Sequence, residues 1–281
     1  MRRIVLCSVL LGLVMAARAD AQQRPLVTED PETVGSGLVL VEGGIDYWND
    51  IFYPVSGLTG NQLRFPMVGV SFGLSSIAEL QIDGGLYNRL TVTDRRDAPL
   101  SSRLSFDGDT TSSVADLVIG TKVRLVSEGI RRPAMGVRFA TKLPTSSSES
   151  GLGLDTIDFF GSFLVGKTVQ SIRIVGNVGV GILPDPVQGD RQNDVLTYGL
   201  SLARAIRQGF EVVGEVNGHF DMRDGEPPPG TDSRATMRFG ARYTYNTVRV
   251  DGGLIVGMTS RDPGFGVTAG LTWVFRGFTI Q

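Results

Sequence analysis

The sequence predicts an all-β fold: a transmembrane, antiparallel, up-and-down β-barrel of about twelve strands that follows a cleaved signal peptide. Three observations lead to this prediction. Glycine is abundant, at 37 of 281 residues, which disfavours helices and suits strands and turns. Apolar and polar residues alternate in short segments along most of the chain, as they do in strands with two different faces. The chain also begins with a segment typical of exported proteins.

The first residues have the three parts of a secretory signal peptide. Two arginines follow Met1, an apolar run extends from Ile4 to Ala17, and small residues flank the end of the segment. We expect cleavage after Ala21, with Ala19 as the alternative, so residues 1–21 are the predicted signal peptide. The apolar run is shorter than the roughly 20 residues that a membrane-spanning helix needs.

Cysteine content and charge exclude several classes of protein. The only cysteine, Cys7, lies in the predicted signal peptide, so the mature chain has no disulfide and no cysteine-based metal site. Removing residues 1–21 takes away three arginines and one aspartate, which leaves 24 basic and 28 acidic residues. A mildly acidic chain gives no reason to expect nucleic acid as a partner.

Period-two alternation locates the predicted strands. Between Val114 and Leu125, for example, Ile119 lies on an apolar face while Lys122 and Arg124 share the opposite face. The same pattern predicts strands at 37–47, 62–73, 76–91, 114–126, 134–143, 156–167, 171–183, 194–207, 209–220, 233–245, 247–259 and 265–275.

The links between these strands alternate in length. Five long polar links are expected at 48–61, 92–113, 144–155, 184–193 and 221–232, and they interleave with short turns. Outer-membrane barrels have short periplasmic turns, long external loops and an even number of strands. A soluble β-sandwich has no reason to sort its loops by length. We therefore expect an outer-membrane barrel over residues 37–281, a periplasmic N-terminal segment at 22–36, and both termini in the periplasm.

The predicted last strand resembles an assembly signal. Gly270, Trp273 and Phe275 form a glycine followed by alternating apolar and aromatic residues, which resembles the C-terminal signal of outer-membrane barrels. Six residues, 276–281, follow it here, whereas the usual pattern ends at the aromatic residue. The resemblance implies that these three residues bind the outer-membrane assembly machinery, and the barrel itself implies contact with outer-membrane lipid.

The start of the predicted mature chain resembles a known group of transporters. It reads Arg-Pro-Leu-Val-Thr-Glu-Asp over residues 24–30, then has Gly37, and has Val-Glu-Gly over residues 41–43. This is similar to the beginning of outer-membrane transporters of the phenol-degradation meta-pathway family. The resemblance implies an uptake channel for small molecules, aromatic or otherwise apolar.

The polar face of the predicted strands faces the barrel interior. The interior-facing set, which we expect to line the lumen, is Glu42, Asp46, Glu79, Asp83, Asp116, Lys122, Arg124, Arg138, Arg173, Glu211, Glu215, Arg238, Arg242, Arg249 and Asp251. Opposed acidic and basic walls would orient a polar or zwitterionic solute. Alternatively, the same residues form ion pairs that fill and brace a narrow interior. A barrel of twelve strands lies between a filled barrel of eight and an open one of sixteen.

These observations predict a passive channel or transporter for small molecules, with no enzymatic activity, cofactor or metal. Two alternatives are a plugged structural or adhesion barrel and a hydrolase that uses His219, the only histidine, with nearby Asp221 or Asp224. No nucleophile is indicated by spacing. The segment Asp107-Gly-Asp109 resembles part of a calcium loop but lacks its remaining ligands. A soluble periplasmic β-protein is a further alternative.

Overall fold

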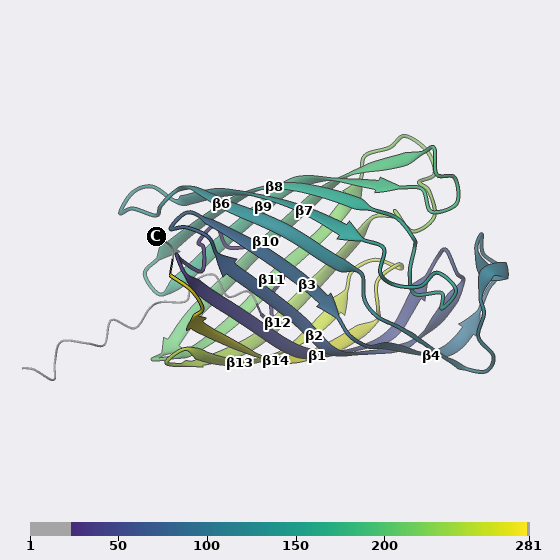
Figure 1. Cartoon of the computed structure of the whole chain (residues 1–281), viewed down its shortest axis with the longest axis horizontal. Helices are drawn as coiled ribbons and strands as arrows, with labels where there is room; N and C mark the ends of the chain where they lie inside the picture. Colours follow the sequence, from purple (N-terminus) through teal and green to yellow (C-terminus); the bar gives the residue numbers. More distant parts are fainter. Residues whose placement is uncertain (1–23, 280–281) are drawn as a thin grey trace, which may run out of the picture.

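The computed structural model describes residues 24–279 as a single closed antiparallel sheet. The predicted signal peptide lies outside this range. The first strand, β1 (Leu38–Tyr53), pairs with β2 (Leu58–Gly73) on one side and with the last strand, β14 (Phe265–Arg276), on the other. These two pairings close the sheet into the elongated barrel of tilted strands seen in Figure 1. No helix within the described residues is long and apolar enough to cross a membrane.

Twelve of the strands in the described range form the barrel wall, which confirms the predicted fold class. Each wall strand pairs with the wall strands before and after it in the chain. Between β2 and β14 the wall contains β3 (Ala78–Gly85), β6 (Leu117–Val126), β7 (Ala134–Leu143), β8 (Asp158–Val169), β9 (Ile172–Pro184), β10 (Gln192–Arg207), β11 (Phe210–Asp221), β12 (Arg234–Tyr245) and β13 (Val248–Gly257).

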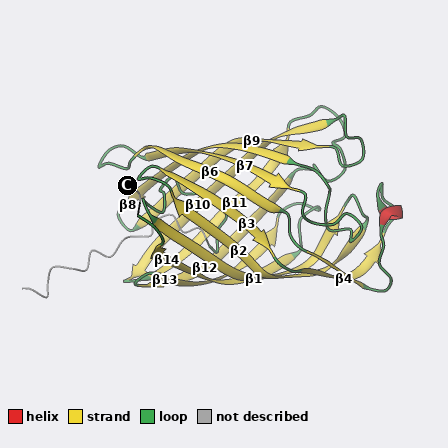
Figure 2. Cartoon of the chain, viewed as in Figure 1, coloured by secondary structure: helices red, strands yellow, loops and turns green. Residues whose placement is uncertain are grey.

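The predicted strand at 76–91 and the predicted loop at 92–113 differ from the structure. The strand is interrupted at Leu86 and Tyr87 and continues as β4 (Asn88–Arg95), and both parts pair with β2. Part of the expected loop forms β5 (Thr110–Ser113), which pairs with β4. This hairpin and a short 3-10 helix, η1 (Ser101–Arg103), extend beyond the wall strands at one end of the molecule (Figure 2).

The prediction of a long link at 48–61 is wrong. The structure continues β1 to Tyr53 and starts β2 at Leu58, so only a tight turn separates them. The polar residues Asn49 and Asp50 suggested a loop, but they lie in a bulge where the β1–β2 register shifts, and Asp50 has a φ of 57°. A β-bulge absorbs extra residues without ending the strand, and aspartate tolerates positive φ better than most residues.

The two faces of the wall have opposite character. Outward side chains are apolar and exposed, with Phe139 at 62% and Leu200 at 54% relative exposure. Inward side chains include charged residues that are completely covered, such as Glu79 and Lys122 at 0%. An apolar outer face around a polar interior is the pattern of barrels that span membranes.

The two ends of the barrel are built differently. Short turns join the wall strands at the end where β1 begins, and the backbone N–H of Gly277 donates to the carbonyl oxygen of Gly37 there, so the start of β1 and the end of β14 lie at this end (Figure 1). At the opposite end the longer links pack on one another. Leu58 and Leu90 form an apolar cluster with Leu104 and Leu152 from two of these links.

The lipid-facing assignment of the outer face can be tested at Leu200, near the middle of β10. We expect Leu200→Arg to lower the free energy of unfolding in lipid vesicles by about 2–4 kcal/mol, the cost of a charge at the bilayer midplane. Urea unfolding followed by tryptophan fluorescence measures this. Leu200→Ala is the control for loss of the side chain. An arginine variant as stable as the alanine variant would show that this face does not contact lipid.

Candidate functional site

The fifteen residues predicted to line the lumen all lie on the inner face of the wall. Fourteen are in strands and Asp116 directly precedes β6. The register places Glu79 opposite Lys122, and Lys122 opposite Arg138. Residues that are directly opposite on neighbouring strands point to the same face. The same reasoning applies to Glu211, Arg242 and Asp251 on β11, β12 and β13.

Acidic and basic residues of neighbouring strands form ion pairs within the wall. Glu215 lies 3.5 Å from Arg238, and Glu211 lies 2.7 Å from Arg242 and 3.9 Å from Arg249. Each of these pairs joins residues of neighbouring or next-but-one strands of the wall. They brace the β11–β13 sector of the wall from inside.

The interior also contains part of the N-terminal segment that the sequence predicted at 22–36. Residues 24–36 run inside the barrel and contact inward-facing groups from β14 at one end of their path to β3 at the other. Two apolar residues pack against the wall on the way, Leu26 with Ala203 and Val213, and Val34 with the cluster around Leu40. We call residues 24–36 the lumen segment.

Arg24 anchors the beginning of the lumen segment against β1, β13 and β14. Its guanidinium donates to Thr268 Oγ1 at 2.8 Å and to the carbonyl oxygen of Ala269 at 2.9 Å. It also lies 3.8 Å from Asp46 and 3.6 Å from Asp251. Arg24 thus brings a positive charge to an acidic part of the wall.

Two opposed glycines make room for this guanidinium. Gly44 and Gly270 face each other across β1 and β14, and a β-carbon at either position would lie 2.3 or 2.2 Å from Arg24. In this structure Gly270 therefore forms part of the Arg24 site. The neighbouring Trp273 is 47% exposed with its ring centroid 4.4 Å from that of Phe275, and the assembly role of these three residues stays a prediction.

Glu215 holds the middle of the lumen segment by its backbone. Its carboxylate accepts hydrogen bonds from the backbone N–H groups of Val27 and Thr28, each at 2.9 Å. Gly199 on β10 faces Thr28, whose hydroxyl oxygen would lie 2.8 Å from an added β-carbon. The wall therefore fits the path of the segment both by hydrogen bonding and by shape.

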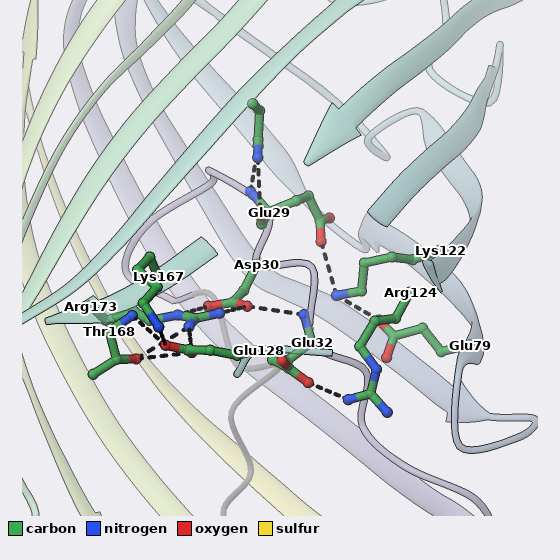
Figure 3. A network of polar contacts seen from close by, with 11 residues as sticks. Glu29, Asp30, Glu32, Glu79, Lys122, Arg124, Glu128, Lys167, Thr168 and Arg173 are labelled. Carbon is green, nitrogen blue, oxygen red and sulfur yellow. Dashed lines mark hydrogen bonds and ion pairs between the residues drawn. The ribbon is translucent and has the colours of Figure 1, made fainter. Parts of the chain in front are cut away.

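The acidic part of the lumen segment lies against basic residues of the wall. Figure 3 shows the carboxylates of Glu29, Asp30 and Glu32 facing Lys122, Arg173 and Arg124, respectively. The distances and partners are as follows: Glu29 lies 3.4 Å from Lys122 and 2.9 Å from Arg138, Asp30 lies 2.6 Å from Arg173, and Glu32 pairs with Arg124. Asn177 completes the set, since its side-chain amide exchanges two hydrogen bonds with the backbone of Glu29.

Glu128, in the turn between β6 and β7, supports Arg173 from the end of the barrel. Its carboxylate lies 2.5 Å from Arg173 and 3.1 Å from Lys167, and it accepts the backbone N–H of Thr168 at 2.8 Å. Partial burial acts to raise the pKa of Glu128, but the Thr168 N–H and the two cations outweigh it and hold the pKa below its ordinary value. Glu128 therefore stays ionised and keeps Arg173 in place.

A cavity of about 360 Å³ remains beside the lumen segment. Arg24, Val27 and Glu29 of the segment border it on one side. Its charged wall residues are Glu42, Asp46, Arg64, Asp83, Arg138 and Arg238. The space that the segment leaves open is therefore lined by both signs of charge.

The described hydrogen bond of His219 is not with either aspartate that the hydrolase hypothesis named, Asp221 or Asp224. Its Nε2 atom lies 2.8 Å from the carbonyl oxygen of Asp232, so this nitrogen donates to the backbone rather than to a carboxylate. The backbone N–H of Asp221 donates to the hydroxyl oxygen of Ser233 at 2.9 Å. Within residues 24–279, no group of three or more His, Cys, Asp or Glu side chains is arranged to hold a metal ion.

The sequence reasoning missed the residues of the lumen segment itself. Residues 24–30 stood out only through a family resemblance, and Glu32 was not singled out. The available signal was the cluster of three acids directly before the first strand. Such a cluster complements the predicted strands at 114–126 and 134–143, whose polar faces are mostly basic.

Comparison with known proteins identifies solved structures that have a similar fold. No protein-family model and no curated protein matches the chain. Among solved structures, the COG4313 outer membrane channel from Pseudomonas putida F1 is similar with a TM-score of 0.62 and 12% identity, over 88% of this chain and 98% of that one. The NanC porin is similar with a TM-score of 0.51 and 9% identity, over 84% of this chain and 98% of that one. The chain therefore has the fold of outer-membrane barrel proteins.

The hydrogen bonds from the backbone of the lumen segment to Glu215 predict that a substitution of Glu215 changes amide hydrogen exchange at Val27 and Thr28. We expect Glu215→Gln to speed hydrogen exchange at Val27 and Thr28 about fivefold, because a hydrogen bond to a neutral acceptor is about 1 kcal/mol weaker than one to a charged acceptor. Exchange mass spectrometry of the refolded protein measures this. Glu211→Gln is the matched control, since Glu211 pairs only with the wall in the described ion pairs. Equal exchange in both variants would contradict this role of Glu215.

Proposed function

We propose that this protein is an outer-membrane channel that passes small molecules by passive diffusion through a charge-lined lumen. In the conformation described above, the lumen segment closes that channel. No bound cofactor or energy source enters the proposal, because diffusion follows the concentration gradient alone.

One observation carries the proposal: a segment joined to the wall at one end fills part of the middle of the barrel, which is therefore not filled by wall side chains alone. Inward-facing glycines, among them Gly44, Gly199 and Gly270, leave the space that this segment occupies. A barrel whose role is purely structural fills its interior with side chains of its own strands. Here, withdrawal of residues 24–36 would open a path along the barrel axis.

The orientation follows from the turns. Outer-membrane barrels place their short turns in the periplasm, and the lumen segment joins β1 at the end with short turns. We therefore propose that both termini are periplasmic and that the segment enters from that side. Trp273 on the outward face of β14 then lies near the periplasmic rim, where the assembly machinery would bind Gly270, Trp273 and Phe275.

The charge of the inner wall bears on the kind of solute. The resemblance to the phenol-degradation family implied aromatic or other apolar molecules. Charged side chains such as Asp46, Arg138 and Arg238 border the remaining cavity, and they favour polar or charged solutes over apolar ones. We therefore propose a polar solute for this channel.

Removal of the lumen segment gives the direct test of a channel. We expect a variant lacking residues 24–34 to show larger and longer single-channel openings in a planar bilayer than the full mature chain, because the obstruction is gone. A variant with a Gly-Ser segment of the same length controls for bulk without specific contacts, and it should also stay open longer than the full chain. A folded barrel that is silent in all three forms would overturn the proposal.

The basic residues of β12 predict the ion selectivity of the open channel. We expect Arg238→Ala with Arg242→Ala to shift the reversal potential toward cation selectivity, because two positive charges leave the lumen while Glu215 and Glu211 remain. Arg131→Ala with Arg132→Ala removes the same charge from an exposed turn and serves as control. An unchanged reversal potential in the β12 variant would show that these residues do not line the path of the ions.

A further inference from the structure

Four basic side chains lie together on one sector of the inner wall. Lys122 and Arg124 are on β6, and Arg138 is directly opposite Lys122 on β7. Arg173 is on β9. All four contact a carboxylate of the lumen segment. We call these four residues the basic sector.

The wall supplies only part of the negative charge that the basic sector needs. Lys122 has a wall carboxylate, Glu79, at 3.0 Å, and Arg173 has Glu128. Arg138 has a neutral wall partner, the side-chain oxygen of Gln81, at 2.7 Å. Arg124 likewise donates to the carbonyl oxygen of Ser76 at 2.7 Å. The ion pairs that the structure describes for Arg124 and Arg138 are therefore with the lumen segment alone.

The shortage of wall carboxylates leaves the basic sector with excess positive charge when the lumen segment leaves the barrel. Asp83 on β3 also acts electrostatically on Lys122 and Arg138, and Lys167 shares Glu128 with Arg173. With these groups included, five positive charges would face three wall carboxylates, an excess of two positive charges in a confined and partly dehydrated space. Uncompensated charge in such a place is costly. An open lumen would therefore favour the entry of an anion at this sector.

The contacts already present are those of carboxylate recognition. Arg173 holds both oxygens of Asp30, with Nη2 2.6 Å from Oδ1 and Nε 2.8 Å from Oδ2, the forked geometry that suits a carboxylate. Lys122 and Arg138 bind different oxygens of Glu29. The side chains of the lumen segment thus occupy preformed carboxylate sites.

The remaining cavity leads to one of these sites. Arg138 and Glu29 both border it, and the Arg138 side chain retains 18% exposure whereas Lys122 has none. A solute in the cavity would reach Arg138 first. A volume of about 360 Å³ is at the small end of ligand pockets, so the solute is a small molecule.

We propose that the basic sector is the binding site of the channel for small organic anions that carry carboxylate groups, and that such a solute opens the channel by replacing the carboxylates of Glu29, Asp30 and Glu32. The inference rests on the proposed function and names its solute class. A carboxylate that replaces a carboxylate leaves no cation unpaired. A neutral or cationic solute leaves Arg124 and Arg138 without a counter-charge and cannot compensate for the loss of the segment.

The test follows the lumen segment in the full mature chain, refolded into vesicles. The predicted mature chain has no cysteine, so Val27→Cys provides a single site for a nitroxide spin label, and Val27 is 44% exposed. Succinate is the probe, and succinamide, its neutral analogue, is the comparison at matched concentration and ionic strength. We expect succinate to raise the mobile fraction of the spectrum at about one tenth of the succinamide concentration, a difference of about 1.4 kcal/mol, because pairs between two charged groups are stronger than hydrogen bonds to a neutral group.

Variants separate binding of the anion from general loosening of the segment. Arg124→Gln with Arg138→Gln weakens the hold on the segment for both solutes but should abolish the advantage of succinate over succinamide. Arg131→Gln with Arg132→Gln removes the same charge from the exposed turn and should keep that advantage. Equal responses to the two solutes in the unsubstituted basic sector, or an advantage that survives Arg124→Gln with Arg138→Gln, would overturn the inference.

The outcome also distinguishes this inference from the proposed function. A variant lacking residues 24–34 that conducts, combined with no advantage of succinate, refutes the solute class and leaves the channel standing. A barrel that is folded but silent with and without the segment, in either solute, refutes both.

Discussion

Closure of the sheet by β1 and β14 is the constraint on which the rest of the structure depends. Their pairing extends from Leu38 opposite Arg276 to Asn49 opposite Phe265. In a lipid environment every backbone N–H and C=O group must find a partner within the protein, so a sheet can span the membrane only when it has no open edge. Closure in turn divides the side chains into two populations. Apolar residues face outward, and charged residues have only the interior left to them.

A charged interior must then balance its own charges, and this chain does so with two sets of contacts. Within the wall, neighbouring strands pair Glu211 with Arg242 and Glu215 with Arg238. Elsewhere the balance comes from the lumen segment, which brings Arg24 to the acids near β1 and β13 and three carboxylates to the basic sector. Gly44 and Gly270 have no side chains and so leave room for the Arg24 guanidinium. The shape of the interior and its charge therefore favour the same position of the lumen segment. The segment is therefore part of the folded interior in this conformation.

The sequence predicted the wall more completely than the site. Period-two alternation reports directly which face of a strand is apolar, so the predicted strand at 134–143 has the same bounds as β7, Ala134–Leu143. The extension of β1 was missed because Asn49 and Asp50 form a bulge, and a bulge has the composition of a loop. The position of the lumen segment was missed for a different reason. It has no periodicity, and its contacts come from partners as remote as Thr268, which is 244 residues from Arg24 in the chain. Such contacts depend on closure of the barrel and leave no local pattern.

In the proposed channel, the attachment of the lumen segment to β1 at Leu38 determines how a solute competes with the segment for the basic sector. A ligand tethered by a short flexible chain has an effective concentration on the order of millimolar at its own binding site. A free solute therefore meets a competitor that never diffuses away and whose local abundance does not depend on how many copies of the protein are present. Reclosure after the solute leaves is an intramolecular event. The length and stiffness of residues 33–37 therefore set the solute concentration that is needed to open the channel. Changes in this short stretch would retune the channel without touching the wall or a single charged side chain.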